Sequence, residues 1–291
     1  MRSNTASTRL SPLWAAPGGE VYRVGAKNFS EQYILADLMA ARLRSAGAQT
    51  RTRDDLGSAT IYRALAANEI DVYVDYSGTL WANVLGRTDN PGRAAVLAGA
   101  KTELARRDGV LLLGPLGFEN AYALAMRQDR AGALGVASLD DLARQSSGLT
   151  LGSDLEFLSR PEWRSVKAAY GLSFRKLVSY QPTFMYAALM DGQADVISAF
   201  SSDGRIEADH LVLLADPRRA LPPYDAVILI SPKRAHDARL LAALSPLIGA
   251  IDVTSMRQAN YSVDRQTEKL TPAAAAIRLA AKIATRAGPT R

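Results

Sequence analysis

The chain has no cysteine and only two histidines among its 291 residues. Without cysteine it can form no disulfide, no thiol nucleophile and no cysteine-ligated metal site. His210 and His236 lie in different expected elements, which excludes a metal site built from several histidines. We therefore expect the protein to use no metal and no other cofactor.

Long apolar runs are also missing. A membrane-spanning helix needs ~20 consecutive apolar residues, and the longest candidate, 240–253, is interrupted by Ser245, Pro246 and Asp252. Residues 1–19 are rich in serine, threonine, proline and glycine and lack the apolar core of a secretory signal. A shortened start, a trimmed leader and an uncleaved start all fit this composition. We expect residues 1–19 to be disordered or a residual leader outside the fold.

The sequence carries none of the common catalytic motifs. It lacks the Gly-x-Ser-x-Gly elbow, the Gly-x-x-x-x-Gly-Lys phosphate loop and the His-Glu-x-x-His zinc motif. Carboxylate pairs such as Asp140/Asp141 fall in expected turns or helix starts. We expect that the protein is not an enzyme. Because a fold does not fix a function, an enzyme on the same fold is kept as an alternative.

The charges are spread along the chain. There are 35 basic and 29 acidic residues, which give a formal charge of +6. A nucleic-acid-binding protein gathers its cations on one face together with exposed aromatic residues. Here the densest basic group lies between Arg42 and Arg53, and the rest are dispersed. The pattern indicates a solvated surface of mixed charge and no nucleic-acid partner.

Apolar or alternating runs take turns with helical patterns, which is typical of an α/β fold. Expected strands lie at 21–24, 70–74, 110–113, 121–126, 149–152, 174–178, 194–200, 211–214 and 226–230. Helical patterns lie between them, and helices dominate after residue 230. The alternation of strand and helix predicts a mainly parallel sheet.

Three sequence signals mark expected helix starts. Ser30 stands before a helical pattern and predicts an N-cap. The segment Ser138-Leu-Asp-Asp141 has the form of a capping box. Pro272 suits the first turn of the final helix, since proline is tolerated there.

Four aromatic residues stand at or near the ends of strand-like runs: Tyr76, Tyr122, Phe200 and Tyr224. Ligands of open α/β sheets bind at the carboxyl ends of strands, so rings placed there can converge on one crevice. The negative face of an aromatic ring attracts a cation. Several such faces together suit a quaternary ammonium group, which has no N–H to donate. We call these four residues the aromatic box.

The segments that contain these rings, together with Gly25-Ala-Lys-Asn-Phe-Ser-Glu-Gln32, occur in the same order as similar segments of one protein family. From Val21 to about Ala284 the chain resembles the substrate-binding proteins of ABC importers for glycine betaine, choline and carnitine. The resemblance implies a bilobed periplasmic-binding-protein-like fold, with two α/β lobes joined by two crossovers and the ligand between them. It places the crossovers in the Gly- and Pro-rich segments 114–120 and 216–223. Lobe 1 would comprise 20–116 and 222–291, and lobe 2 residues 117–221.

The resemblance also assigns the aromatic box. Tyr76, in Tyr73-Val-Asp-Tyr-Ser-Gly-Thr79, matches a cage tyrosine, as do Tyr122 in Asn-Ala-Tyr-Ala-Leu and Tyr224 in Pro-Pro-Tyr-Asp. At the fourth cage position the family usually has tyrosine before Ser-Thr-Asp-Gly-Arg, whereas this chain has Phe200 before Ser-Ser-Asp-Gly-Arg. Phenylalanine keeps the ring face and loses the hydroxyl.

Three further residues carry expected roles at the polar end of a ligand. Lys27 matches the lysine of the family's opening motif, and Thr79 matches a pocket threonine. Arg160, in Glu-Phe-Leu-Ser-Arg, is the best match for the anchoring arginine, although the sequence around it follows the family less closely. A carboxylate needs such charge-assisted donors.

The resemblance implies a function. The protein would capture a small quaternary ammonium compound outside the cytoplasm, in the periplasm or at the cell-envelope exterior, and deliver it to the membrane permease of an ABC importer. We expect it to act as a monomer. A ligand-sensing domain of a regulator or receptor would use the same pocket and is the main alternative.

Overall fold

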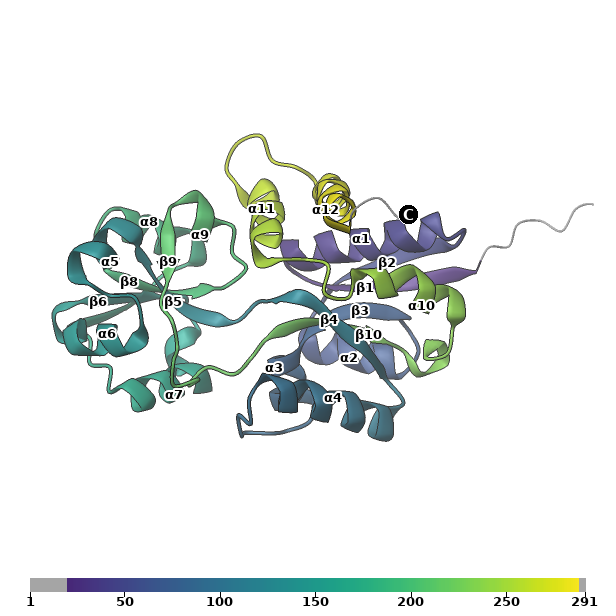
Figure 1. The fold of residues 1–291 in the computed structure, drawn as a ribbon, viewed down its shortest axis with the longest axis horizontal. Helices are drawn as coiled ribbons and strands as arrows, with labels where there is room; N and C mark the ends of the chain where they lie inside the picture. The colour runs from purple at the N-terminus through teal and green to yellow at the C-terminus, as the bar shows by residue number, and fades with distance from the viewer. Residues whose placement is uncertain (1–19, 288–291) are drawn as a thin grey trace, which may run out of the picture.

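The computed structural model describes residues 20–287, and the expectation for residues 1–19 falls outside them. These residues form two five-stranded sheets with helices on both faces, at opposite ends of the long axis of the molecule (Figure 1). Two chain segments run between the sheets, one from β4 to β5 and one from β9 to β10. The α/β bilobed fold is confirmed.

The first sheet has the order β2-β1-β3-β10-β4. β1 is parallel to β2 and β3, whereas β10 is antiparallel to β3 and β4. Its strands are β1 (Val21–Lys27), β2 (Gln49–Leu56), β3 (Val72–Tyr76), β4 (Leu111–Glu119) and β10 (Asp225–Ile230). Its helices are α1 (Ser30–Ser45), α2 (Ser58–Ala66), α3 (Ser77–Thr79), α4 (Arg93–Asp108), α10 (Ala238–Leu244), α11 (Val253–Asp264) and α12 (Pro272–Ala287).

The second sheet has the order β7-β6-β8-β5-β9. β6 is parallel to β7 and β8, and β5 is antiparallel to β8 and β9. Its strands are β5 (Tyr122–Arg127), β6 (Thr150–Ser153), β7 (Lys176–Ser179), β8 (Val196–Phe200) and β9 (Leu211–Leu213). Its helices are α5 (Gln128–Leu134), α6 (Leu139–Gln145), α7 (Pro161–Tyr170), α8 (Pro182–Met190) and α9 (Arg205–Ala208).

Short helical turns join several of these elements. A π-helical turn follows α3 directly, and single 3-10 turns lie in both lobes. They are η1 (Leu80–Val84), η2 (Ser146–Gly148), η3 (Phe157–Ser159), η4 (Pro232–Arg234) and η5 (Ser245–Leu247).

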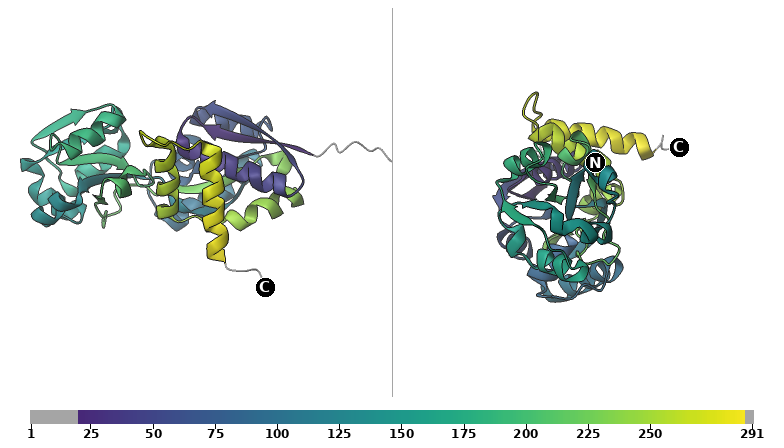
Figure 2. Two further views of the ribbon diagram at one scale, coloured as in Figure 1. Left: turned by 90° about the horizontal axis from the view of Figure 1, so that it is seen from above. Right: turned by 90° about the vertical axis from the view of Figure 1, so that its left-hand side faces the viewer.

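Each face of each sheet carries an apolar core. β3 shows how one strand serves two cores: Val72 and Val74 pack toward α1, and Tyr73 packs toward α2 and α4. β10 is buried along its whole length, as its continuous apolar run requires for a strand covered on both faces. α12 lies against α1 and α11, and closes the first lobe on that side (Figure 2).

The prediction of a mainly parallel sheet is wrong, because four strand pairs are parallel and four are antiparallel. A parallel pair needs a crossover connection, usually a helix. β5 and β10 instead arrive directly from the other lobe, so each enters its sheet against the direction of its neighbours.

Strand β2 was not expected from the sequence. Residues 49–55 are Gln-Thr-Arg-Thr-Arg-Asp-Asp, which contain no apolar side chain. β2 lies at the edge of the first sheet, where charged side chains discourage pairing with another chain. The hydrophobic pattern therefore gives no signal for it.

The expected helix starts have mixed outcomes. Ser138 and Asp141 form the capping box, and α12 begins at Pro272, so both predictions are confirmed. The prediction of Ser30 as an N-cap is wrong. The capping position is Phe29, and the Ser30 hydroxyl donates to Asp264 Oδ1 at 2.5 Å. Across residues 20–287 we find no helix with the length and apolarity that crossing a bilayer requires.

Candidate ligand-binding site

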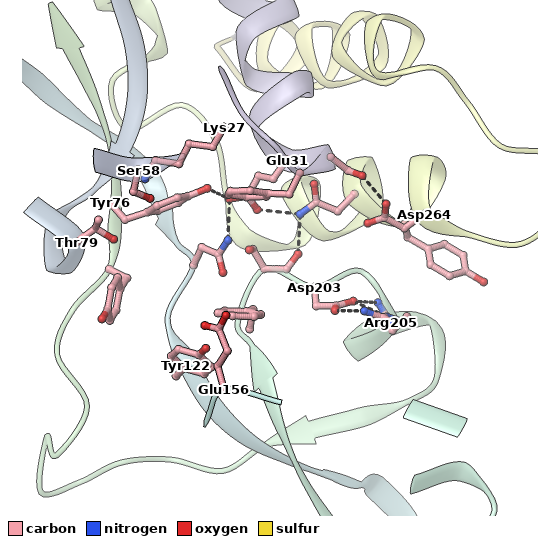
Figure 3. A pocket seen from close by; sticks show the side chains of 18 of the residues that line it. Lys27, Glu31, Ser58, Tyr76, Thr79, Tyr122, Glu156, Asp203, Arg205 and Asp264 are labelled. Carbon is pink, nitrogen blue, oxygen red and sulfur yellow. Dashed lines mark hydrogen bonds and ion pairs between the residues drawn. The ribbon is translucent and has the colours of Figure 1, made fainter. Parts of the chain in front are cut away.

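A cavity of about 1030 Å³ lies between the two sheets and is lined by residues of both (Figure 3). All seven residues singled out in the sequence line it: Lys27, Tyr76, Thr79, Tyr122, Arg160, Phe200 and Tyr224. The structure therefore brings together side chains that are far apart in the sequence, from Lys27 to Tyr224.

The aromatic box forms because the crossover strands are antiparallel. Tyr76 ends β3, and Tyr224 precedes β10, in which Ala226 pairs with Tyr76. Phe200 ends β8 and pairs directly with Tyr122 at the start of β5. The expectation of rings at the carboxyl ends holds for Tyr76 and Phe200 only. The other two lie at amino ends, which meet the same sheet edge when the strands run in opposite directions.

The rings differ in packing. Tyr76, Tyr122 and Tyr224 are buried, whereas Phe200 is 40% exposed. The Phe200 ring packs on Tyr122 at a centroid distance of 4.5 Å and an interplanar angle of 38°. Phe29 is a cavity aromatic that the sequence analysis missed, and its ring stacks on Tyr76 at 6.3 Å. Phe29 lies directly before α1 and outside any strand-like run, so a search for aromatic residues at strand ends does not find it.

Lys27 lines the cavity with an ammonium group that already has a partner. Its Nζ lies 2.5 Å from Asp75 Oδ1, and both side chains are buried. Asp75 also accepts a hydrogen bond from the Tyr73 hydroxyl at 2.6 Å. Lys27 Nζ lies 5.2 Å from the centroid of the Tyr76 ring. The lysine therefore lies close to the Tyr76 ring and also lines the cavity.

Arg160 connects the two lobes through Glu162. Its guanidinium makes two bonds to the Glu162 carboxylate, from Nε at 3.2 Å and from Nη2 at 3.0 Å. The Tyr224 hydroxyl donates to the same carboxylate at 2.6 Å. Burial opposes ionisation of Glu162, but these bonds hold its pKa below the ordinary value. Arg160 Cζ lies 5.1 Å from the centroid of the Tyr122 ring. Arg160 therefore lies over one ring of the aromatic box and is linked to a second, Tyr224, through Glu162.

Glu31 is a buried cavity residue that the sequence analysis passed over. Tyr76 donates its hydroxyl to Glu31 Oε1 at 2.6 Å (Figure 3). Asn120 and Asn260 donate their amide groups to the same carboxyl at 3.1 and 2.8 Å. Burial raises the pKa of Glu31, and the hydrogen bonds from Tyr76, Ser202, Asn260 and Asn120 oppose that rise. Desolvation also raises the pKa of Tyr76, so its phenol stays a neutral donor.

The rim of the cavity carries a fixed turn. Asp203 accepts hydrogen bonds from the backbone N–H of Arg205 at 2.9 Å and from its guanidinium at 2.7 and 3.0 Å. Asp203 also accepts a bond from the Tyr186 hydroxyl at 2.9 Å. Within residues 20–287, no three histidine, aspartate or glutamate side chains come together as a metal site requires.

A cavity between two α/β lobes, lined by rings from both, is the site of a solute-binding protein. Residues 21–281 match the family model of the substrate binding domain of ABC-type glycine betaine transport systems. The chain belongs to this family. Its role is that of a transport substrate-binding protein and not of an enzyme, and the regulator alternative is not favoured.

Curated relatives and solved structures agree with this assignment. A carnitine transport binding protein of Listeria monocytogenes is 27% identical over 252 residues, 84% of this chain and 82% of that protein. A glycine-betaine-binding protein of Pseudomonas aeruginosa is 29% identical over 266 residues, 87% and 85% of the two chains. The crystal structure of a glycine betaine/carnitine/choline ABC transporter has a TM-score of 0.84 and 25% identity, and covers 90% of this chain and 98% of that one.

Proposed function

We propose that the protein captures a quaternary ammonium compound in the aromatic box and delivers it, outside the cytoplasmic membrane, to the permease of an ABC importer. The observation that carries this proposal is the convergence of Tyr76, Tyr122, Phe200 and Tyr224 on one cavity. A trimethylammonium group is bound by ring faces rather than by hydrogen bonds, and it gains most where water is excluded. Three of the four rings are buried.

The polar end of the ligand would face the three other predicted residues, Lys27, Thr79 and Arg160. Arg160 is one-third exposed at its side chain, so its guanidinium has N–H groups left for a carboxylate or a hydroxyl. Thr79 adds a hydroxyl from the short helix that follows Tyr76. Lys27 would act mainly through its charge, because its ammonium is bound to Asp75.

The lobe boundaries and the oligomeric state belong to the same proposal. We propose lobe 1 as residues 20–116 and 222–291 and lobe 2 as residues 117–221, acting within one monomer. The rings would then come two from each lobe, and a ligand would hold both lobes together. Light scattering from the purified chain, with and without ligand, measures whether one copy suffices.

A calorimetric panel tests the ligand. Choline, glycine betaine, carnitine and proline betaine each carry a quaternary nitrogen, whereas ectoine does not and serves as the control solute. We expect at least one of the first four to bind with a dissociation constant in the micromolar range or lower, as ring contacts and desolvation together allow. Binding of ectoine alone, or of none of the five, would refute the proposed function.

Phe200 provides a graded test of the box. The benzene ring presents the same negative face as a tyrosine, so we expect Phe200→Tyr to stay within about tenfold of the parent affinity. Phe200→Ala also removes the ring that packs on Tyr122, and we expect it to weaken binding more than the tyrosine variant does. If only the tyrosine variant binds a quaternary ammonium compound, the pocket serves another solute.

A further inference from the structure

The cationic side chains of the cavity all have a carboxylate beside them. Among residues 20–287, four lysine or arginine side chains line the cavity, and each lies within 3.8 Å of a carboxylate. The cavity wall therefore offers N–H donors to a ligand but no unbalanced positive charge. The four pairs are Lys27 with Asp75, Arg160 with Glu162, Arg205 with Asp203, and Arg265 with Glu268.

The pair of Arg160 and Glu162 lies closest to the aromatic box. Glu162 is 5% exposed and accepts two bonds from the Arg160 guanidinium and one from the Tyr224 hydroxyl. Burial favours the neutral form of Glu162, but the bonds from Arg160 and Tyr224 outweigh it and lower the pKa of the carboxyl. Glu162 is therefore ionised at neutral pH. Together the two side chains form a unit without net charge beside Tyr122 and Tyr224.

The other buried cation is balanced in the same way. The side chains of Lys27 and Asp75 are 5% and 1% exposed, so the charge of the lysine acts on the cavity only together with that of the aspartate. Arg205 makes two bonds to Asp203, at 3.0 and 2.7 Å. Three further carboxyl groups line the cavity, and none of them adds positive charge in either protonation state: Glu31, Asp209 and Asp264.

This balance bears on the polar end of the ligand. A carboxylate loses its hydration in a buried site, and that cost is recovered only where an opposite charge is available to it. A hydroxyl or an amide costs less to bury and can still accept a bond from the N–H groups that Arg160 has left.

We propose that the site selects quaternary ammonium compounds with a neutral polar end, which are net cations, over zwitterionic betaines. Glu162 would be the residue that sets this preference, because it balances the charge of Arg160. This inference rests on the proposed function and narrows it to one class of ligand.

Glycine betaine and its carboxamide test the selection on the unaltered protein. The two compounds share the trimethylammonium group and the carbon skeleton, and differ in whether the far end is a carboxylate or a neutral amide. We expect the carboxamide to bind about tenfold more tightly or better, and choline, with its neutral hydroxyl, also to bind more tightly than glycine betaine. Titration calorimetry in one buffer measures the ratio.

A variant then assigns the preference to Glu162. Glu162→Gln keeps the size of the side chain and an oxygen that accepts hydrogen bonds, and removes the negative charge. Arg160 would then carry an unbalanced charge, so we expect the affinity ratio of carboxamide to glycine betaine to fall by about tenfold or more. General damage to the site weakens both ligands and leaves their ratio unchanged.

Glu156→Gln is the matched control, because it makes the same change at a second carboxylate beside the same arginine. Glu156 Oε2 lies 3.6 Å from Arg160 Nη1, and the Glu156 side chain is 76% exposed. Water and salt screen an exposed charge, so the ratio should stay within about twofold of the wild type.

The possible outcomes separate the two proposals. If quaternary ammonium compounds bind but glycine betaine binds as tightly as its carboxamide, the selection is refuted and the proposed function stands. A preference that survives in Glu162→Gln, or that falls equally in Glu156→Gln, overturns the role of Glu162. If no quaternary ammonium compound binds at all, both proposals fail. The wild-type ratio decides the class of ligand even if the Glu162 variant does not fold.

Discussion

Replacing Tyr76 with alanine is expected to weaken binding of a quaternary ammonium ligand by about 10- to 100-fold, on the order of 1–3 kcal/mol. The ring is 5% exposed, its centroid lies 6.3 Å from that of Phe29, and Lys27 Nζ lies 5.2 Å from it. Alanine would remove one ring face from the cation and open a space beside the apolar core of the first lobe. It would also remove a donor from Glu31. Titration calorimetry at a temperature where both proteins are folded measures the change.

Tyr76→Phe is the matched control for this prediction. It keeps the ring face and the packing and deletes only the hydroxyl that donates to Glu31 Oε1. We expect its affinity to stay within about tenfold of the wild type. If the alanine variant binds as tightly as the wild type, Tyr76 is a packing residue without a role in the site. If the phenylalanine variant loses as much as alanine does, the hydroxyl and not the ring face is the important group.

The sequence predicted those parts of the site that can be identified from a few consecutive residues. Each of the four box residues lies in a short motif at the end of a strand-like run, and each motif can be identified without reference to the others. The alternation of strands and helices was enough to predict an α/β fold. The directions of β5 and β10 could not be predicted in this way, because they depend on which lobe the chain comes from.

The parts that sequence analysis missed depend on contacts between distant positions. Glu31 and Asn260 are hydrogen-bonded although they are 229 positions apart. A glutamate at a helix start is explained by its favourable interaction with the helix dipole, and an asparagine within a helix does not by itself indicate a binding site. Lys27 was expected as a cation for the ligand, but its buried partner Asp75 lies 48 positions away. Spacing along the chain cannot reveal such pairs.

Gly204 lies where the turn after β8 meets helix α11, with no room for a side chain. A Cβ atom built there would lie 2.4 Å from the Tyr261 Cβ and 2.5 Å from the Arg257 carbonyl oxygen. The φ angle of Gly204 is −65°, which any residue can adopt. Glycine is therefore required for space and not for conformation. The same contact is held by a hydrogen bond from Arg257 Nε to the Ser201 carbonyl oxygen at 2.8 Å.

Gly204→Ala is expected to lower the free energy of unfolding by about 1–3 kcal/mol, as overpacking of a close contact does. The obstructing atoms belong largely to the backbone of α11, so the turn or the helix must shift as a whole. Gly132→Ala is the matched control, because a Cβ there meets nothing within 4 Å. It lies within α5, where alanine favours the helix by roughly 0.5–1 kcal/mol over glycine. Denaturant unfolding of the two variants without ligand measures the difference.

The expected shift also reaches the site. Asn260 is next to Tyr261 on α11, and its amide bonds both Glu31 and the Ser202 backbone oxygen. Moving α11 away from the turn would stretch one of these bonds, so Gly204→Ala should weaken ligand binding as well as stability. The control, Gly132→Ala, should lower neither the ligand affinity nor the free energy of unfolding. Equal stability of the two variants would mean that the contact at Gly204 relaxes without cost, and the turn would then not set the position of Asn260.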